Sequence, residues 1–244
     1  MINIKKRRVF EYFINAASDI AREEGIDKIT IRNVSDRAGY NSATLYNYFN
    51  NLEQLLAFTV IHSITEYLYD IDKVIKSNED CLIKYILAWN QYCYHSFNNP
   101  NVYTYAFDST NSTYTLSQIE NYMKVFPERI MSDDKAPTVT VIGGSIEERE
   151  MDMLEPCIDK GYMTADAARR IYNLGYLLQQ GTLYRLMHNK EQYPVEEARI
   201  TFIRYFIDFV NSQLLPDVPT IIFEDLNEII VTYGLKSQIK NTPL

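Results

Sequence analysis

Two glycines, Gly25 and Gly39, divide the first fifty residues into three short segments whose apolar residues recur with helical spacing. In the first segment they recur every three or four positions, which predicts an amphipathic helix over about 5–24. Glycine directly after the last apolar position is a common helix stop, because it adopts the left-handed conformation without a steric penalty. This part of the chain is therefore restricted to short helices separated by turns at the two glycines.

A second and a third helix follow closely. Thr30 is a suitable N-cap for the second helix, which ends at Gly39. Asn41 or Ser42 can cap a third helix that continues through Phe49. Two short helices joined by a turn of three or four residues that contains glycine have the spacing of a helix-turn-helix motif.

The third helix has one apolar face and one small, polar face. At about 100° per residue, Leu45 and Phe49 share the inner face, and Ala43 and Asn47 lie opposite them. The residues on its flanks are Thr44 and Tyr46. A helix that enters the major groove of DNA needs small side chains for close approach and polar groups that reach the base edges. The outward face offers both.

The same region resembles the TetR family of transcriptional regulators over residues 9–57. The matching positions are Ala16-Ala17, Gly25, Ile29-Thr30-Ile31, Val34, Ala38-Gly39, Thr44-Leu45-Tyr46-x-Tyr48-Phe49 and Glu53-x-Leu55-Leu56. The resemblance implies an all-α fold: an N-terminal three-helix helix-turn-helix DNA-binding domain, then a helical-bundle domain for ligand binding and dimerisation. It also implies a repressor that binds a pseudo-palindromic double-stranded DNA operator as a homodimer and is released by a small-molecule effector.

The resemblance further assigns DNA contacts to individual residues. Thr30 and Arg32, at the start of the second helix, would touch phosphate or a base. The residues that would face base edges are Asn41, Ser42, Ala43 and Asn47. Those that would grip phosphates or a thymine methyl group are Thr44, Tyr46 and Tyr48.

One position departs from the family pattern. The family usually carries a lysine where this chain has Leu52, after a serine that is Asn51 here. Without the phosphate contact of that lysine, we expect weaker anchoring on the DNA backbone and a shallower salt dependence of binding. The basic run at 5–8 (Lys-Lys-Arg-Arg) would compensate if it contacts DNA; the alternative is a solvated terminus.

Helical patterns continue through the rest of the chain, and Asn51 can cap the first of these further helices. Helices are expected at about 51–76, 78–97, 101–107, 116–131, 145–159, 165–189, 195–214 and 221–234. We assign residues 1–50 to the DNA-binding domain, with the helix-turn-helix at about 30–49. Residues 51–76 form a connecting helix, and 77–244 form the ligand-sensing and dimerisation domain.

The 244-residue chain has a formal net charge of −8, unevenly distributed. Residues 1–50 carry eight Lys and Arg against six Asp and Glu, a balance of +2, which leaves −10 for the remainder. A basic head on an acidic body permits contact with DNA by the head alone. Neither a signal peptide nor a membrane-spanning run is recognisable, so we expect a cytoplasmic protein without a membrane partner. Three cysteines without CxxC spacing are expected to be reduced thiols.

Aromatic residues concentrate between Tyr85 and Phe126, where 11 of 42 residues are aromatic, against 13% in the whole chain. One interpretation is a pocket for an apolar or aromatic effector. Its candidate lining residues are Trp89, Tyr92, His95, Tyr103, Phe107 and Tyr122. The other interpretation is a bulky helical core.

Broad apolar faces on the helices expected at 165–189 and 195–214 make them candidates for a dimer interface. The family resemblance implies that the last two main helices pair with their counterparts in a four-helix arrangement. The candidate residues are Ala168, Ile171, Tyr172, Gly175, Leu178, Ile200, Ile203, Ile207 and Val210. The alternative is that both helices belong to the core of one protomer.

Three other interpretations are weaker. The segment 30–49 as an ordinary three-helix core would leave Tyr46 and Tyr48 exposed without a packing role. A helical adaptor that binds protein would have to explain a complete groove-reading face. An enzyme is not expected, because the sequence offers no nucleophile-base pair and no phosphate loop. The three histidines fall on different expected helices, so we expect neither a metal site nor a cofactor.

Overall fold

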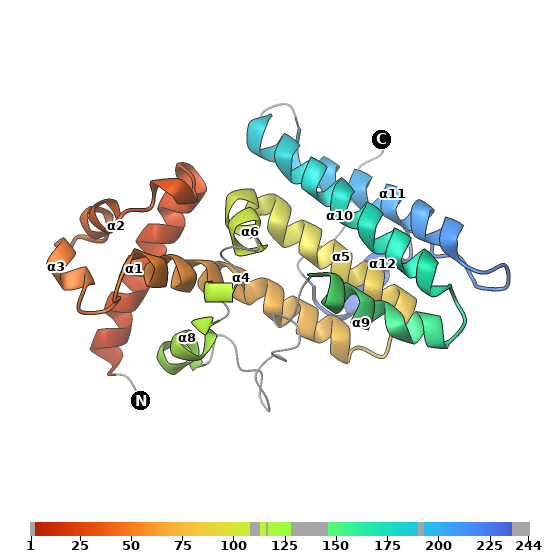
Figure 1. Cartoon of the computed structure of the whole chain (residues 1–244), viewed down its shortest axis with the longest axis horizontal. Coiled ribbons are helices and arrows are strands. Elements are labelled where there is room, and N and C mark those ends of the chain that lie inside the picture. Colours follow the sequence, from red (N-terminus) through yellow and green to blue (C-terminus); the bar gives the residue numbers. More distant parts are fainter. Residues whose placement is uncertain (1–2, 108–112, 116, 128–145, 190–192, 236–244) are drawn as a thin grey trace. The chain divides into compact units, whose positions relative to one another are not determined.

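The computed structural model describes residues 3–107, 113–115, 117–127, 146–189 and 193–235 (Figure 1). All regular secondary structure in these ranges is helical, so the predicted all-α fold is confirmed. The chain forms two compact units, which are described separately. Unit 1 comprises Met1–Tyr69 and Asn99–Ile142, and unit 2 comprises Asp70–Asn98 and Gly143–Leu244.

Unit 1 contains the three helices expected at the N-terminus and four further pieces. Its elements are α1 (Ile4–Glu23), the 3-10 turn η1 (Ile26–Lys28), α2 (Ile31–Ala38), α3 (Ser42–Leu45), the first part of α4 (Leu52–Lys76), α6 (Pro100–Phe107) and α8 (Ile119–Val125). α8 is shorter than the helix expected at 116–131, part of which lies outside the described residues. α4 occupies the stretch expected for the connecting helix and contributes to both units.

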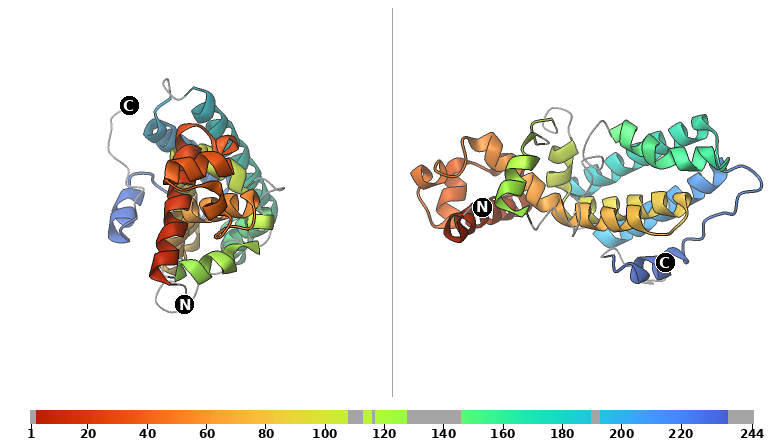
Figure 2. Two further views of the ribbon diagram at one scale, coloured as in Figure 1. Left: turned by 90° about the vertical axis from the view of Figure 1, so that its left-hand side faces the viewer. Right: turned by 90° about the horizontal axis from the view of Figure 1, so that it is seen from below.

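Unit 2 is a bundle of longer helices. Besides the end of α4, its elements are α5 (Cys81–Asn98), α9 (Ile146–Asp159), α10 (Ala165–His188), α11 (Val195–Gln213) and α12 (Leu226–Thr232). α5 contacts α9, α10, α11 and α12, so it lies at the centre of the bundle. α10 and α11 also pack on each other, and Figure 2 shows them side by side.

The helix ends of unit 1 follow the caps that the sequence predicts. The hydroxyl of Thr30 accepts a hydrogen bond from the backbone N–H of Asn33 at 3.1 Å. The side chains of Asn41 and Asn51 cap α3 and α4 in the same way, at 2.7 and 2.8 Å. Side-chain caps of this kind satisfy backbone donors that have no partner within the helix. Gly39 ends α2 with φ of 76°, the left-handed conformation that favours glycine.

The core of unit 1 is aromatic. The rings of Phe10 and Phe49 lie 5.1 Å apart in an edge-to-face arrangement. Phe58 of α4 meets Phe49 edge-on at 5.5 Å, and Tyr122 of α8 lies 5.5 Å from Phe58. Such pairs add attraction beyond the burial of their surface. They hold α3, which is too short to be stable alone, against α1 and α4.

In unit 2, a small residue allows close contact at the centre. An added Cβ at Gly175 of α10 would lie 2.8 Å from the Phe206 ring and 3.0 Å from Trp89. The indole of Trp89 also stacks on Phe202 of α11 at 5.6 Å. α5, α10 and α11 thus meet at one aromatic cluster. None of the described helices combines the length and the apolarity needed to cross a bilayer.

Candidate nucleic-acid interface

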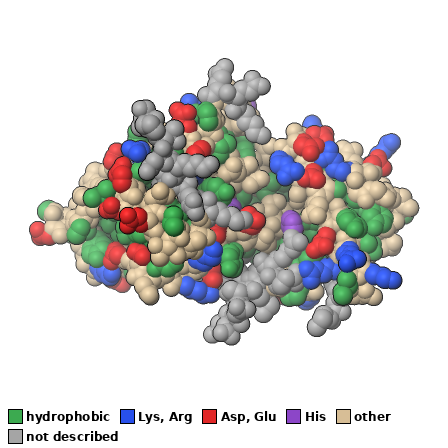
Figure 3. All heavy atoms as spheres, turned by 180° about the vertical axis from the view of Figure 1, so that it is seen from behind, with side chains coloured by type: hydrophobic (Ala, Val, Ile, Leu, Met, Phe, Trp, Pro, Cys, Tyr) green, Lys and Arg blue, Asp and Glu red, His purple; other side chains and the backbone are tan. Residues whose placement is uncertain are grey.

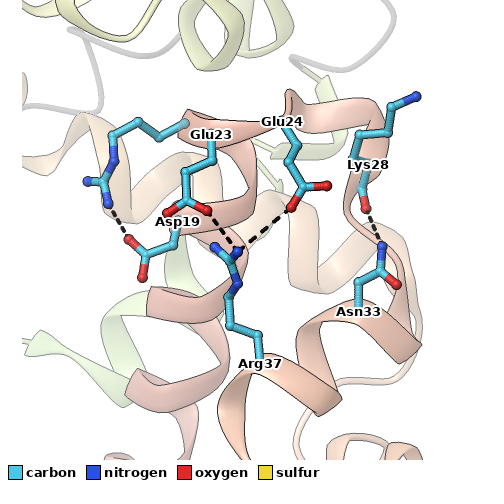
Figure 4. A network of polar contacts seen from close by, with 7 residues as sticks. Asp19, Glu23, Glu24, Lys28, Asn33 and Arg37 are labelled. Carbon is cyan, nitrogen blue, oxygen red and sulfur yellow. Dashed lines mark hydrogen bonds and ion pairs between the residues drawn. The ribbon is translucent and has the colours of Figure 1, made fainter.

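A polar network joins α2 to the end of α1 (Figure 4). The guanidinium of Arg37 on α2 binds the carboxylate of Glu23 at 2.7 Å and lies 3.7 Å from that of Glu24. The hydrogen bond with Glu23 is the main cause that raises the pKa of Arg37. Asn33 donates a hydrogen bond to the backbone carbonyl of Lys28 at 3.2 Å. These contacts fix the end of α2 to the end of α1 and the start of α2 to η1.

The side chains around α3 are buried or exposed as the helical spacing predicts. Leu45 and Phe49 are fully buried, whereas Ala43 and Asn47 are exposed. Tyr46 is 57% exposed, although it is a large ring. The helix itself is shorter than expected, because beyond Leu45 the backbone tightens into turns in which Asn47 N–H bonds to Thr44. A small, polar surface therefore projects from the end of unit 1.

Tyr48 differs from the expectation of an exposed side chain. It is half-buried, and its ring packs edge-on against Phe10 at 5.1 Å and against Phe13 at 5.8 Å. The ammonium of Lys6 lies 6.0 Å from the centre of the ring. The chain turns back toward α1 directly after α3, which brings this ring onto the core. Tyr48 thus has a packing role in addition to the DNA contact predicted for it.

Several other side chains predicted to contact DNA are half-buried or already form hydrogen bonds within the protein. The side-chain oxygen of Asn41 accepts bonds from both the backbone N–H and the hydroxyl of Thr44, at 2.7 and 2.9 Å. Ser42 and Thr44 are half-buried. Thr30 and Arg32 are exposed at the start of α2, where the Thr30 hydroxyl caps the helix.

Charge near this surface is mixed. Leu52, where the family usually has a lysine, is the half-buried first residue of α4. Lys5, Lys6 and Arg8 are exposed on the first two turns of α1, and the half-buried Arg7 lies over the ring of Phe126 at 5.4 Å. On the face drawn in Figure 3, acidic and basic side chains are interspersed and neither sign forms a broad patch.

The six residues predicted to line an effector pocket divide between the two units. Trp89 and His95 are buried in unit 2, with Tyr92 half-buried beside Trp89 at 6.0 Å. Tyr103 and Tyr122 are buried in unit 1, where the hydroxyl of Tyr122 lies 2.9 Å from Nδ1 of His62. The side chain of Phe107 lies outside the described residues. His95 Nε2 lies 3.0 Å from the carboxylate of Asp70.

The structure adds an acidic group that sequence reasoning missed. Glu150 on α9 accepts hydrogen bonds from the Tyr85 hydroxyl at 2.8 Å and from the Trp89 indole N–H at 2.9 Å. Burial raises the pKa of this carboxyl to about 7. Tyr85 and Trp89 are four residues apart on one face of α5, which is a detectable signal. Nothing in the sequence links that face to position 150.

The residues predicted for a dimer interface lie mostly inside unit 2. Those that are buried are Ala168, Ile171, Gly175, Ile203, Ile207 and Val210, and those that are half-buried are Tyr172, Leu178 and Ile200. The exposed apolar side chains of α10 and α11 are others: Leu177 is 67% exposed, Tyr184 62% and Tyr205 63%. Leu177, Gly181 and Tyr184 follow one another at four- and three-residue steps along α10.

In the part of the chain that the structure describes, no group of three or more His, Cys, Asp or Glu side chains could hold a metal ion. The described cysteines are all free thiols.

Residues 13–57 match the family model of bacterial regulatory proteins of the tetR family. This match covers the end of α1, the helix-turn-helix and the start of α4. Comparison with curated proteins gives no match.

Solved structures with a similar fold are also regulators. A putative tetR-family transcription regulator from Shewanella sp. PV-4 is 13% identical, with 85% of this chain and 98% of that chain covered and a TM-score of 0.53. FadR from Bacillus halodurans, a fatty acid degradation regulator, is 14% identical, with 81% and 94% covered and a TM-score of 0.55. SmeT, the repressor of the Stenotrophomonas maltophilia multidrug efflux pump SmeDEF, is 15% identical, with 86% and 93% covered and a TM-score of 0.53.

A helix-turn-helix of this kind is a motif of DNA-binding proteins. The family model and the fold together confirm the resemblance found in the sequence. The N-terminal part of this chain, residues 13–57, is therefore similar to the tetR family of bacterial regulatory proteins, and the chain shares its fold with solved regulators.

Proposed function

We propose that this protein is a ligand-responsive repressor that binds a pseudo-palindromic DNA operator as a homodimer through α3. The observation that carries the proposal is that one face of α3 is buried in the core of unit 1 while the opposite face is exposed. Leu45 and Phe49 are fully buried, which fixes the helix, while Ala43, Tyr46 and Asn47 are exposed. A capped, small-faced helix held rigidly on an aromatic core is suited to the major groove.

Individual contacts follow from this geometry. The amide of Asn47 can pair with a base edge, and a good pairing of this kind contributes about 1–3 kcal/mol. Thr30 and Arg32, exposed at the start of α2, would touch the phosphate backbone. The hydroxyl of Tyr46 would do the same from the flank of α3. Asn41 would contribute through its amide N–H groups, because its oxygen already caps α3.

Quantitative DNA binding with matched variants tests this part of the proposal. We expect Asn47→Ala to weaken binding to DNA fragments selected by the wild-type protein by about 5- to 150-fold. The control is Asn15→Ala, because Asn15 is an exposed asparagine on α1 away from α3. Tyr46→Phe and Tyr12→Phe form a second pair, since both tyrosines are more than half exposed. Equal affinities for all four variants and the wild type would contradict the proposal.

For the dimer, the exposed stripe of α10 is the surface we favour. An isolated Leu177 or Tyr184 on a surface is ordinary, but here they flank Gly181, where an added Cβ would meet nothing within 4 Å. A glycine there lets a second helix approach closely, and burying the flanking apolar side chains supplies the driving force. Tyr205 of α11 extends the same kind of surface.

Oligomeric state measured by light scattering tests the dimer. Leu177→Lys should shift the protein toward monomer, because the charge would be buried without a partner. Ile222→Lys is the control, since Ile222 is an exposed aliphatic residue of unit 2 outside α10 and α11. If both variants remain dimers, the interface lies elsewhere, and a monomeric wild type would reject the dimer itself.

We propose that the effector is a small apolar or aromatic molecule that binds the body. The support is the aromatic cluster around Trp89 in unit 2, together with the solved complex of the fold neighbour SmeT with triclosan. That neighbour is 17% identical with a TM-score of 0.51. α4 belongs to both units, so it is the element through which a change in the body would reach α3. The effector must bind more tightly to the geometry that does not bind DNA.

Trp89 is the single tryptophan of the chain, so intrinsic fluorescence reports on this cluster. A titration with triclosan and other apolar aromatic compounds should change Trp89 emission and release DNA over the same concentration range. A change in emission without DNA release would separate binding from regulation. Compounds that release DNA without affecting Trp89 would place the effector elsewhere.

A further inference from the structure

Two of the three cysteines meet in unit 2, where the start of α5 packs on the end of α9. Cys81 is the first residue of α5, and Cys157 lies in the last turn of α9. Asp80 bonds to both Lys160 and Tyr162, at 2.8 and 3.1 Å, and the N–H of Tyr162 bonds back to the Cys157 carbonyl. These contacts bring together two segments that are far apart in the sequence.

Cys81 directly follows Asp80, and Cys157 lies one helical turn before Lys160, so the bond between Asp80 and Lys160 brings the two cysteines close together. Burial, followed by the hydrogen bond with Cys81, raises the pKa of the Cys157 thiol well above its ordinary value. The third cysteine, Cys93, lies further along α5 and is fully buried. Burial also raises the pKa of Cys93. Only one pair of thiols in the chain is therefore placed to react together.

The environments of the paired thiols are unequal. Cys81 is half-buried and reachable from solvent, whereas Cys157 is fully buried. The ammonium of Lys160 is close enough to interact with Cys81, and its hydrogen bond to Asp80 is the main cause that raises the pKa of Lys160. The thiolate is the reactive form of cysteine, and burial disfavours it at Cys157. The Cys81 thiol also lies 3.6 Å from Asp80, whose charge is offset by Lys160.

We propose that Cys81 and Cys157 are a peroxide-sensitive dithiol that closes into a disulfide between α5 and α9. The Cys81 thiolate attacks one oxygen of hydrogen peroxide, the O–O bond breaks, and the departing hydroxide takes up a proton to become water. The sulfenic acid formed on Cys81 is then attacked by the sulfur of Cys157, which loses its proton as the S–O bond breaks and a second water leaves. Two thiols are oxidised and one peroxide is reduced to two waters.

A thiol that solvent reaches, beside a buried partner, is the arrangement that makes such oxidation reversible, because the disulfide forms before further oxidation of the first sulfur. The bond would tie together the same two helices that are joined by the Glu150 hydrogen bonds to Tyr85 and Trp89. This inference does not depend on DNA binding or on an effector.

Peptide mapping of the full-length protein tests it. After treatment with hydrogen peroxide, alkylation in denaturant should modify one cysteine instead of three, and that one should be Cys93. Trypsin should release residues 77–84 linked to residues 150–160, and a reductant should separate them. Three alkylated cysteines, a link that includes Cys93, or a link between two chains would each overturn the proposal.

Variants separate the roles of the two thiols. Cys93→Ser should still give the linked peptides. Cys81→Ser should give no link and leave Cys157 unmodified, whereas Cys157→Ser should leave a sulfenic acid on Cys81 that dimedone traps. Trapping on Cys157 instead would reverse the roles and contradict the argument from burial. The wild-type peptide map decides the existence of the pair even if Cys157→Ser fails to fold.

Discussion

The carboxyl of Glu150 should make folding stability depend on pH in an unusual direction. Its carboxylate faces two neutral donors on α5, Tyr85 and Trp89, and burial raises its pKa from the ordinary 4.5 to about 7. The folded state therefore binds this proton more tightly than the unfolded chain does. The resulting stability is fully present below about pH 4.5 and is lost as the pH rises through about 7.

The magnitude follows from the two pKa values. The gap between 4.5 and about 7, at about 1.36 kcal/mol per pKa unit, amounts to about 3 kcal/mol. Glu150 is half-buried by accessible surface, and solvent screening reduces the effect, so we expect about 2 kcal/mol. Glu150→Gln keeps an acceptor for both donors and removes the charge. The variant should gain about this much stability over the wild type between pH 5 and pH 8.5.

Urea unfolding followed by far-ultraviolet circular dichroism measures this difference. Trp89 emission is unsuitable here, because its indole bonds to the group that titrates. The control is Glu155→Gln, which removes an exposed carboxylate of the same helix. Its free energy of unfolding should change with pH in parallel with that of the wild type. If the free energies of unfolding of Glu150→Gln and the wild type differ by the same amount across this pH range, the reasoning from burial is refuted.

Other predictions concern packing and DNA contact. Gly175→Ala should lower the free energy of unfolding by about 1–3 kcal/mol, because the new Cβ would lie 2.8 Å from the Phe206 ring. In the monomeric Leu177→Lys background, Gly181→Ala on the same helix should be neutral or stabilising by up to about 1 kcal/mol, since nothing in the same chain lies within 4 Å of its Cβ. Equal effects of the two glycine substitutions in urea titrations of that background would contradict both predictions. Leu52→Lys should tighten DNA binding and steepen the slope of log affinity against log salt by about 0.9, and an unchanged slope would show that the added lysine meets no phosphate.

Local signals account for most of what the sequence predicts correctly. The caps at Thr30, Asn41 and Asn51 act over three residues, so they are visible in the sequence and are confirmed by the structure. The burial of Leu45 and Phe49 follows from helical spacing in the same way. The starts of these three helices and the inner face of α3 therefore required no knowledge of distant contacts.

Contacts between distant segments were harder to predict. An apolar face on a helix shows that it is covered, but not whether the cover is another helix of the same chain or a second copy. Ile171 and Ile203 are covered within unit 2, while Leu177 is exposed. The link between Glu150 and Trp89 spans 61 residues and leaves no local pattern. Tyr48 packs on α1 because the chain turns after a shorter α3 than its spacing suggests.

The most direct measurement is a selection of duplex DNA from a random pool by the full-length protein, followed by sequencing of the bound fraction. We expect enrichment of an inverted repeat whose half-sites are separated by about one helical turn, or a multiple of it, since two copies of α3 must reach two grooves. The same selection with Asn47→Ala should lose that enrichment. A wild-type pool without any enriched sequence, or a repeat selected equally well by the variant, would contradict the assignment of α3 as the element that reads DNA.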